Sequence, residues 1–238
     1  VVHLAGEGIG DKRWTDDQKR KILESRTKGT ALLCEALASL NDQPPVLVSG
    51  SAIGYYGDRD DEQLTETSAP GEGFLADVAV AWEAATEPAT AAGIRVVKAR
   101  TGIALGRDGG ALPRLVRLAR LGVLGKLGSG RQWMSWVSLA DEIGALRFLL
   151  EHPVSGPVNL TAPGPVTNAV FTKALGRVVH RPTVLPIPSF GPKLLLGAEL
   201  ADALLFEGQR VLPDVLLDAG YEFQHEELET ALHSILDR

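Results

Sequence analysis

Short apolar runs rich in β-branched residues alternate along the chain with longer stretches in which apolar residues recur every three or four positions. The short runs predict buried strands at residues 1–5, 46–48, 94–99 and 157–160. The longer stretches predict amphipathic helices between them. Strand, helix and strand in this order favour right-handed parallel crossovers, so we expect an α/β fold built on a parallel sheet.

The first predicted helix begins at a capping box. Thr15 supplies the N-cap hydroxyl, Gln18 follows three residues later, and Asp16 and Asp17 place acids in the first turn. Arg26 lies on the apolar stripe of this helix, which also carries Ile22, Gly29, Leu33, Leu37 and Leu40. An inward guanidinium needs a carboxylate, backbone carbonyls or a ligand phosphate, and the alternative is that it reaches water along its own stem.

Later helices are predicted at residues 74–85, 112–121, 141–151, 170–179, 193–206, 214–219 and 226–236. Four prolines between residues 182 and 192 mark a change in character before the last three of these helices. We therefore expect two domains, residues 1–180 and a small, mostly helical C-terminal domain at 181–238. Repeated glycines indicate insertions on the substrate side near residues 109–135.

Composition excludes several classes of protein. The chain has 238 residues, of which 45% are hydrophobic, and a formal charge of −6. The cations are scattered among acids, so we expect no nucleic-acid partner. No apolar run approaches the roughly 20 residues of a spanning helix, so we expect no membrane association. The single cysteine, Cys34, cannot form an intrachain disulfide and fits a cytoplasmic protein.

Small and polar residues follow three of the predicted strands. They are Ala5, Gly6 and Glu7 after the first strand, Ser49, Gly50 and Ser51 after the second, with Tyr55 and Tyr56 close behind, and Arg100, Thr101 and Gly102 after the third. Ligands of open α/β sheets bind at the carboxyl ends of the strands, so these residues are candidates to surround a shared ligand. The alternative is that they form ordinary tight turns behind core strands.

A second group of candidates follows the glycine-rich segment. Arg131 and Trp133 could form a wall of a substrate pocket, because an indole offers flat apolar area and a guanidinium binds phosphate or carboxylate. Packing of the tryptophans is the alternative. The five histidines show no metal-ligand spacing, so we expect no metal.

The chain opens directly on an apolar run, and no window has the G-x-G-x-x-G spacing of a dinucleotide fingerprint. We expect that the natural protein starts earlier and that the fingerprint lies in that segment. Without those glycines and the helix behind them, the 238 residues alone should bind a dinucleotide poorly.

Several motifs resemble one family when taken together. They are His3-Leu4-Ala5-Gly6-Glu7, Lys12-Arg13-Trp14, Ser25-Arg26 with Gly29-Thr30, Ser49-Gly50-Ser51-Ala52 with Gly54-Tyr55-Tyr56-Gly57-Asp58, Arg100-Thr101-Gly102, and Gly128-Ser129-Gly130-Arg131-Gln132-Trp133-Met134-Ser135-Trp136. They resemble the atypical extended short-chain dehydrogenase/reductases, the epimerase-family or nucleoside-diphosphate-sugar-epimerase-like proteins. Residues 208–213 and 219–221 resemble the C-terminal domain of that group.

The resemblance implies a Rossmann-like sheet that binds NADP(H), or NAD(H), with a small-molecule or nucleotide-linked substrate between the sheet and the C-terminal part. It assigns the cofactor to the three strand ends. Glu7 could take a ribose hydroxyl and Arg13 a phosphate, unless both lie in a solvated loop.

The better-known extended dehydrogenases use a Tyr-x-x-x-Lys helix for proton transfer, and residues 73–83, the corresponding helix by this resemblance, contain no such pair. One hypothesis is therefore an oxidoreductase or epimerase that uses Ser51, Tyr55 or Tyr56, with Arg26 lowering the tyrosine pKa. The other is a dinucleotide-binding protein without turnover, in which the cofactor tunes a partner interaction.

Overall fold

A four-stranded parallel sheet forms the centre of the computed structural model, which describes residues 1–183 and 186–237. The strand order is β1 (Val2–His3), β2 (Val46–Ala52), β4 (Arg95–Thr101) and β8 (Gly156–Leu160). The buried run at the start of β2 is Val46–Val48, as the hydrophobic pattern predicts. The parallel α/β prediction is confirmed.

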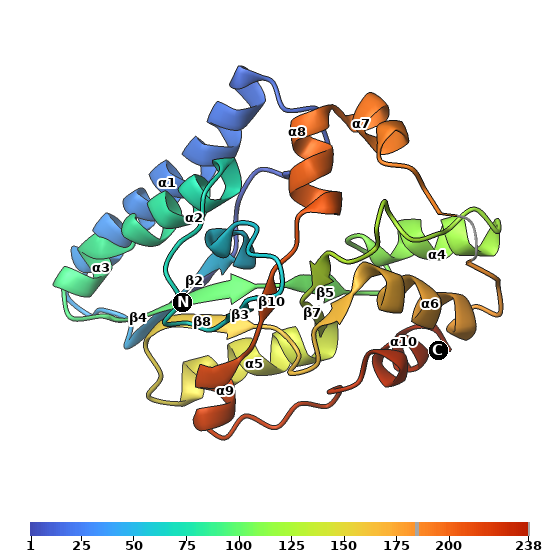
Figure 1. Ribbon diagram of the computed structural model, residues 1–238. Helices are drawn as coiled ribbons and strands as arrows, with labels where there is room; N and C mark the ends of the chain where they lie inside the picture. The colour runs from blue at the N-terminus through green and yellow to red at the C-terminus, as the bar shows by residue number, and fades with distance from the viewer. Residues whose placement is uncertain (184–185, 238) are drawn as a thin grey trace.

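Helices cover both faces of this sheet (Figure 1). One face carries α1 (Asp16–Ala38), α2 (Phe74–Ala84) and α3 (Glu87–Ala91), and the other carries α5 (Leu139–Glu151) and α9 (Asp214–Asp218). Leu47 and Val96 pack with Cys34 of α1, whereas Val48 and Val97 pack with Leu149 of α5. Because side chains alternate along a strand, neighbouring residues of β2 and β4 meet different helices.

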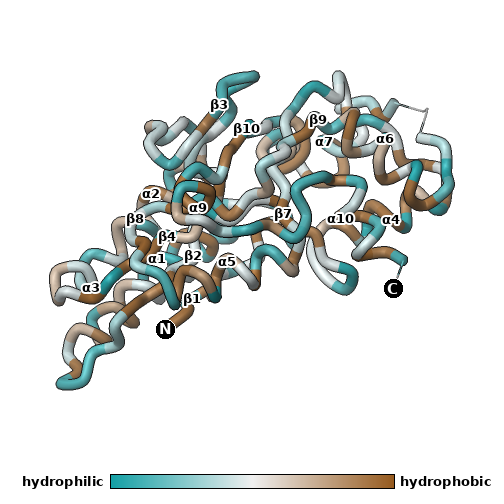
Figure 2. The backbone as a smooth tube through the Cα atoms, turned by 90° about the horizontal axis from the view of Figure 1, so that it is seen from below, coloured by the Kyte–Doolittle hydropathy of each residue, from teal (hydrophilic) through white to brown (hydrophobic). Residues whose placement is uncertain are grey.

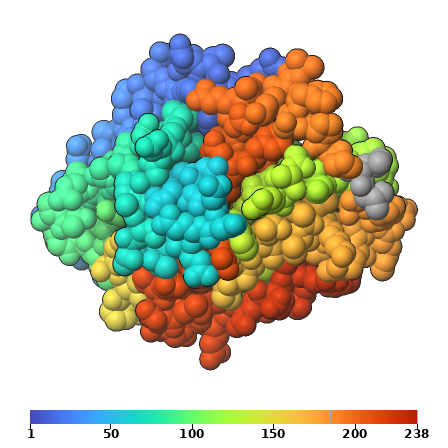
Figure 3. Space-filling view, viewed as in Figure 1, coloured from blue at the N-terminus to red at the C-terminus, as the bar shows by residue number. Residues whose placement is uncertain are grey.

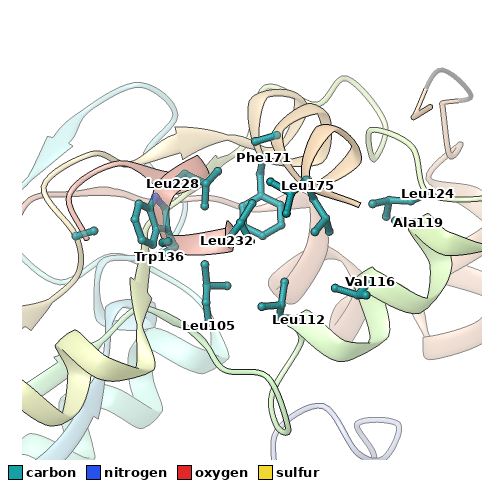
Figure 4. Packing of buried hydrophobic residues seen from close by; sticks show 14 residues of the cluster. Leu105, Leu112, Val116, Ala119, Leu124, Trp136, Phe171, Leu175, Leu228 and Leu232 are labelled. Atoms are coloured by element: carbon teal, nitrogen blue, oxygen red, sulfur yellow. The ribbon is translucent and has the colours of Figure 1, made fainter. Parts of the chain in front are cut away.

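A second core lies beside the sheet. It joins β5 (Ile103–Leu105) and β7 (Trp136–Ser138) to α4 (Leu112–Arg120), α6 (Asn168–Val178) and α10 (Leu228–Leu236). Figure 4 shows Trp136, Phe171 and Leu232 packed at its centre. The helix predicted at 170–179 begins at Asn168 because Thr167 caps it, and the helix predicted from 141 begins at Leu139 because Ser138 caps it.

The C-terminal part packs onto the rest of the chain at several places. β10 (Arg210–Val211) pairs in parallel with β3 (Gln63–Leu64). Within residues 1–180, β6 (Trp133–Met134) pairs antiparallel with β9 (Val166–Thr167). Lys19 of α1 forms an ion pair with Glu199 of α8 (Ala198–Ala201). In Figure 3 the N-terminal and α7–α8 surfaces adjoin at the top. The domain boundary at residue 180 stays a prediction, and residues 184, 185 and 238 of the proposed second domain lie outside the described part.

The helix predicted over 193–206 is wrong as a single element. The chain forms α7 (Phe190–Leu196), then α8, and then a π-helical turn at Asp202–Phe206. Gly197 separates the first two with φ of +94°, a left-handed conformation that ends a helix. Among the helices of the described residues, none combines the length and apolar character needed to cross a bilayer.

Candidate functional site

Three polar residues occupy aligned positions on neighbouring strands at the carboxyl end of the sheet. The strand register aligns Ser51 of β2 with Arg100 of β4, and Arg100 with Asn159 of β8. All three side chains are buried. The first two were predicted as site residues, whereas Asn159 was not, because nothing in the sequence reports strand register.

A buried ion pair holds this row to α2. Arg100 Nε donates to Glu83 Oε1 at 2.7 Å, and Arg100 Nη2 donates to Glu83 Oε2 at 2.9 Å. The Ser51 hydroxyl donates to the same Glu83 Oε1 at 2.7 Å. The paired geometry compensates two charges that are both almost completely removed from water. The predicted catalytic hydroxyl of Ser51 is therefore bound to a carboxylate.

Tyr56 completes what we call the strand-end network, which consists of Ser51, Tyr56, Glu83, Arg100 and Asn159. Its hydroxyl donates to Asn159 Oδ1 at 2.7 Å and accepts from Arg100 Nη1 at 2.9 Å. The ring is fully buried, and burial raises the pKa of Tyr56 to about 12 although Arg100 acts in the opposite direction. The predicted lowering of this pKa is therefore wrong.

Tyr55 lies at the surface side of the same network. It occupies the turn Ile53–Tyr56 after β2 and is only half-buried. The guanidinium carbon of Arg100 lies 3.5 Å from the centre of its ring, and the Tyr56 ring meets it edge to face at 5.3 Å. The cation thus faces the tyrosine ring, and of the two tyrosines Tyr55 is the more accessible.

Arg26 does not lie beside the tyrosines, contrary to the sequence-based expectation. Its Nη1 donates to the carbonyl oxygens of Glu7 at 2.9 Å and Ile22 at 3.2 Å, and its guanidinium carbon lies 5.0 Å from the Trp82 ring centre. Burial lowers the Arg26 pKa. Of the partners that the sequence left open for an inward Arg26, the structure shows backbone carbonyls, and Arg100 takes the place beside the tyrosines.

Arg26 holds the segment that follows β1. Glu7 accepts from Arg26 through its carbonyl, donates its N–H to Ser25 Oγ at 3.0 Å, and accepts from Gln18 Nε2 at 3.1 Å. A Cβ on Gly6 would lie 3.0 Å from Arg26 Cζ, so a larger residue here would push against the guanidinium. Ala5 in the same segment is exposed.

Arg13 contacts another part of the chain. Its Nη2 donates to the carbonyl oxygens of Leu194 at 2.7 Å and Leu195 at 2.8 Å, at the end of α7. These contacts occupy the guanidinium that was predicted to bind a phosphate. Within β2, Ser49 is buried, and a Cβ on Gly50 would lie 2.9 Å from a ring carbon of Trp82.

A second buried glutamate lies on the opposite face of β4. Glu142, in the first turn of α5, accepts from Thr101 Oγ1 at 2.8 Å, and its Oε2 is buried without a hydrogen-bond partner among the described residues. Burial raises the pKa of Glu142 to about 7. Gly102, which follows Thr101 in the chain, approaches the Ser135 carbonyl so closely that a Cβ would lie 2.5 Å from that oxygen.

The predicted substrate wall includes a residue that the sequence interpretation missed. Trp133 donates from Nε1 to Asp61 Oδ1 at 2.8 Å, and Arg210 of β10 places its guanidinium carbon 4.5 Å from the Trp133 ring centre. Arg210 Nε is buried without a partner among the described residues, whereas Arg131 is exposed. The sequence signal that could have identified Arg210 is the Gly208-Gln209-Arg210 motif, which we interpreted only as a mark of the family.

Metal chemistry has no visible basis in the part of the chain described. No group of three or more His, Cys, Asp or Glu side chains there is placed to hold an ion.

A parallel sheet covered on both faces, with polar residues gathered at its strand ends, defines a Rossmann-like α/β protein. The family model described as "NAD dependent epimerase/dehydratase family" matches residues 1–161, and one described as "Domain of unknown function (DUF1731)" matches residues 187–235. The chain belongs to the NAD dependent epimerase/dehydratase family.

Relatives and solved structures agree with this assignment. Epimerase family protein Mb2239 of Mycobacterium bovis is 46% identical over 233 residues, which are 98% of this chain and 76% of that protein. Epimerase family protein YfhF of Bacillus subtilis is 38% identical over 237 residues, 99% of this chain and 77% of that protein.

The crystal structure of human epimerase family protein SDR39U1 (isoform 2) with NADPH is similar over 100% of this chain and 81% of that one, with a TM-score of 0.93 and 33% identity. A nucleoside-diphosphate sugar epimerase from Corynebacterium glutamicum has a TM-score of 0.80 and 37% identity, over 99% of this chain and 45% of that one.

Proposed function

We propose that the strand-end site binds NADP(H) and catalyses an oxidoreduction or epimerisation at a carbonyl or carbinol carbon of a small or nucleotide-linked substrate. The observation that carries the proposal is the position of Tyr55, a half-buried tyrosine held over Arg100 at the carboxyl end of the sheet. The NADPH in the similar human structure supports the choice of cofactor.

The proposed cofactor residues come from the three strand ends: Ala5, Gly6, Glu7, Ser49, Gly50, Arg100, Thr101 and Gly102. Two observations support a dinucleotide at the segment after β1: Arg26 fixes this segment through the Glu7 carbonyl, and His3 Nε2 is buried without a partner among the described residues. When bound, the nicotinamide would supply hydride chemistry. NAD(H) is the alternative cofactor. Arg13 can contribute to phosphate binding only by giving up its contacts with α7.

The proton chemistry belongs to Tyr55 in this proposal. Its ring faces a cation that Glu83 holds in place, and its hydroxyl would hold or donate a proton at the substrate oxygen. Ser51 and Tyr56 act as positioning residues, because their hydroxyls are already bonded to Glu83 and Asn159. Arg26 positions the segment after β1.

The substrate would lie toward Trp133 and Arg210, with Arg131 at the rim. The buried, unpartnered Nε of Arg210 supports an anionic substrate group at this wall. A nucleotide-linked substrate would satisfy it through phosphate, and a small substrate through carboxylate.

A second function is favoured by a specific observation. α2 contains no Tyr-x-x-x-Lys pair, and the Ser51 hydroxyl is engaged by Glu83. A protein that binds the cofactor without turnover would need neither a Tyr-x-x-x-Lys pair nor a free Ser51 hydroxyl. In such a protein the bound cofactor would tune an interaction with a partner.

One pair of measurements separates the two functions. NADPH fluorescence is titrated with the protein, and NADPH oxidation is then followed with a panel of aldehydes, ketones and keto-sugar nucleotides. The proposed enzyme predicts binding together with steady oxidation on at least one carbonyl. Binding without oxidation on any of them would select the second function, and no binding by a version of the protein extended at its N-terminus would overturn both.

A further inference from the structure

The helix α4 and its flanking loops carry a concentration of positive charge that the strand-end site does not use. Residues 107–131 contain six basic side chains and one acid, although the whole chain has a formal charge of −6. The cations are Arg107, Arg114, Arg117, Arg120, Lys126 and Arg131, and all are exposed. Such a local excess in an acidic protein creates a positive potential at one end of the molecule.

Three of these arginines line one cleft. Arg107, Arg117 and Arg120 surround a space of about 350 Å³ together with Asp108. The rest of the lining is apolar and consists of Pro113, Val116, Leu121 and Leu236. Figure 2 shows α10, which ends at Leu236, beside α4. The cleft therefore offers both guanidinium donors and an apolar floor.

Exposed arginines on other helices form ion pairs, whereas among the described residues Arg107, Arg117 and Arg120 form none. Arg20, Arg147 and Arg177 each form an ion pair with a glutamate or aspartate. Among the described residues, no carboxylate lies within 4.0 Å of a guanidinium nitrogen of Arg107, Arg117 or Arg120. The negative end of the α4 dipole favours Arg117 and Arg120, which lie in the last turn, but it does not account for Arg107 across the cleft.

We propose that this cleft binds the phosphate of an organic anion, with the apolar part of the ligand against Pro113, Val116, Leu121 and Leu236. Planar guanidinium groups bind phosphate through paired hydrogen bonds, and three of them match a group with several anionic oxygens. None of the lining residues belongs to the strand-end network or to the Trp133–Arg210 wall, so the site is separate from the proposed NADP(H) site. The phosphate can come from a soluble molecule or from a lipid headgroup.

The experiment has two ligand arms and a matched control. Binding of inorganic pyrophosphate is measured by isothermal titration calorimetry, and binding to phosphatidylcholine vesicles with or without phosphatidic acid is measured by co-sedimentation. The test variants are Arg117→Glu and Arg120→Glu. Arg114→Glu makes the same charge change on the same helix outside the cleft. All three residues are exposed, and thermal unfolding checks that each variant is folded.

The proposal predicts that wild type binds in at least one arm and that each test variant binds roughly tenfold more weakly, because each loses a charged hydrogen-bonding partner. The Arg114→Glu control should retain its affinity to within about twofold, since an exposed charge outside the cleft is screened. Binding of pyrophosphate identifies a soluble anion, and binding of phosphatidic-acid vesicles alone identifies a lipid headgroup. Absence of binding in both arms, or an equal loss in the control, would overturn the proposal.

Discussion

Two glutamates at the end of β4 are buried on opposite faces of the sheet, and their surroundings differ. Arg100 and Thr101 are neighbours in sequence, so their side chains point to opposite faces. Glu83 on the first face is held by two nitrogens of Arg100 and by the Ser51 hydroxyl. Glu142 on the second face is held by the Thr101 hydroxyl alone, and one of its oxygens has no partner among the described residues.

The difference shows what a buried carboxylate needs in order to act as a fixed anion. Glu83 has a cation in direct contact, so the ion pair anchors Arg100 beside the Tyr55 ring. Glu142 has no such cation, and burial raises its pKa to about 7. The first face is therefore a rigid support for the proposed site, whereas the second face changes its charge near neutral pH.

The largest change in the free energy of unfolding is expected from breaking the Arg100–Glu83 ion pair. Arg100→Met leaves Glu83 buried without its cation, which should lower the free energy of unfolding by about 3–5 kcal/mol. Denaturant unfolding measures the change. The double variant Arg100→Met/Glu83→Leu should recover much of the loss, because it removes both charges. Arg147→Met, which breaks an exposed pair, should barely move the midpoint. A small loss in Arg100→Met would show that the pair does not hold this face together.

Replacing Glu142 should raise the free energy of unfolding rather than lower it, and the size of the gain should depend on pH. In the folded protein Glu142 keeps its proton up to about pH 7, whereas in the unfolded chain it loses it near its ordinary pKa of 4.5. The folded state thus binds the extra proton between about pH 4.5 and 7, so this group's contribution to stability falls as the pH rises through that window. Glu142→Gln should abolish this dependence.

At pH 8 the Glu142→Gln variant should therefore be more stable than wild type, by on the order of 3 kcal/mol. At pH 4 the two proteins should unfold with similar free energies. Parallel pH dependences for both proteins would contradict the titration of Glu142 in this range.

A smaller loss is expected from Tyr56→Phe. The change leaves Asn159 Oδ1 and Arg100 Nη1 each without one partner in a buried site, at a cost of about 1–2 kcal/mol in the free energy of unfolding. The half-buried Tyr55 forms no such bonds between strands, so Tyr55→Phe should be close to neutral in the same unfolding assay. Equal losses in the two variants would mean that the network extends to Tyr55.

Thr101→Val is expected to have the smallest effect. It removes the one hydrogen bond to Glu142 and keeps the side-chain shape, which should cost about 1 kcal/mol or less at pH 5. The loss of this bond should also raise the Glu142 pKa further, because the hydroxyl favours the ionised form. Nuclear magnetic resonance titration of the carboxyl carbon measures that shift, and an unchanged or lower pKa would contradict the assignment.

The sequence predicted the fold well because strands such as Val46–Val48 and helix caps such as Thr15 are local signals. For the same reason it identified the strand ends that form the proposed site. It did not predict the row of Ser51, Arg100 and Asn159, because register depends on the pairing of distant segments.

The two buried glutamates were missed for a related reason. Glu142 has the position of an ordinary acid in the first turn of a helix, and Glu83 follows Trp82 on an apolar helix. Their burial is set by the sheet against which each helix packs. Arg26 was correctly placed facing inward by its stripe, but the stripe could not tell which segment it would meet.

The central claim is that Tyr55 is the proton-transfer group and that the buried Arg100–Glu83 pair holds it in position. Tyr56 connects this pair to Asn159 of the next strand. The measurement is the NADPH oxidation rate of Tyr55→Phe beside Tyr56→Phe and Ser51→Ala, on a carbonyl substrate found by screening, with the NADPH dissociation constant determined for each. We predict that Tyr55→Phe loses about 10²-fold or more in kcat with unchanged cofactor affinity. Full activity in Tyr55→Phe would contradict the assignment of proton transfer to Tyr55 and would make the Trp133–Arg210 wall the next candidate for the catalytic site.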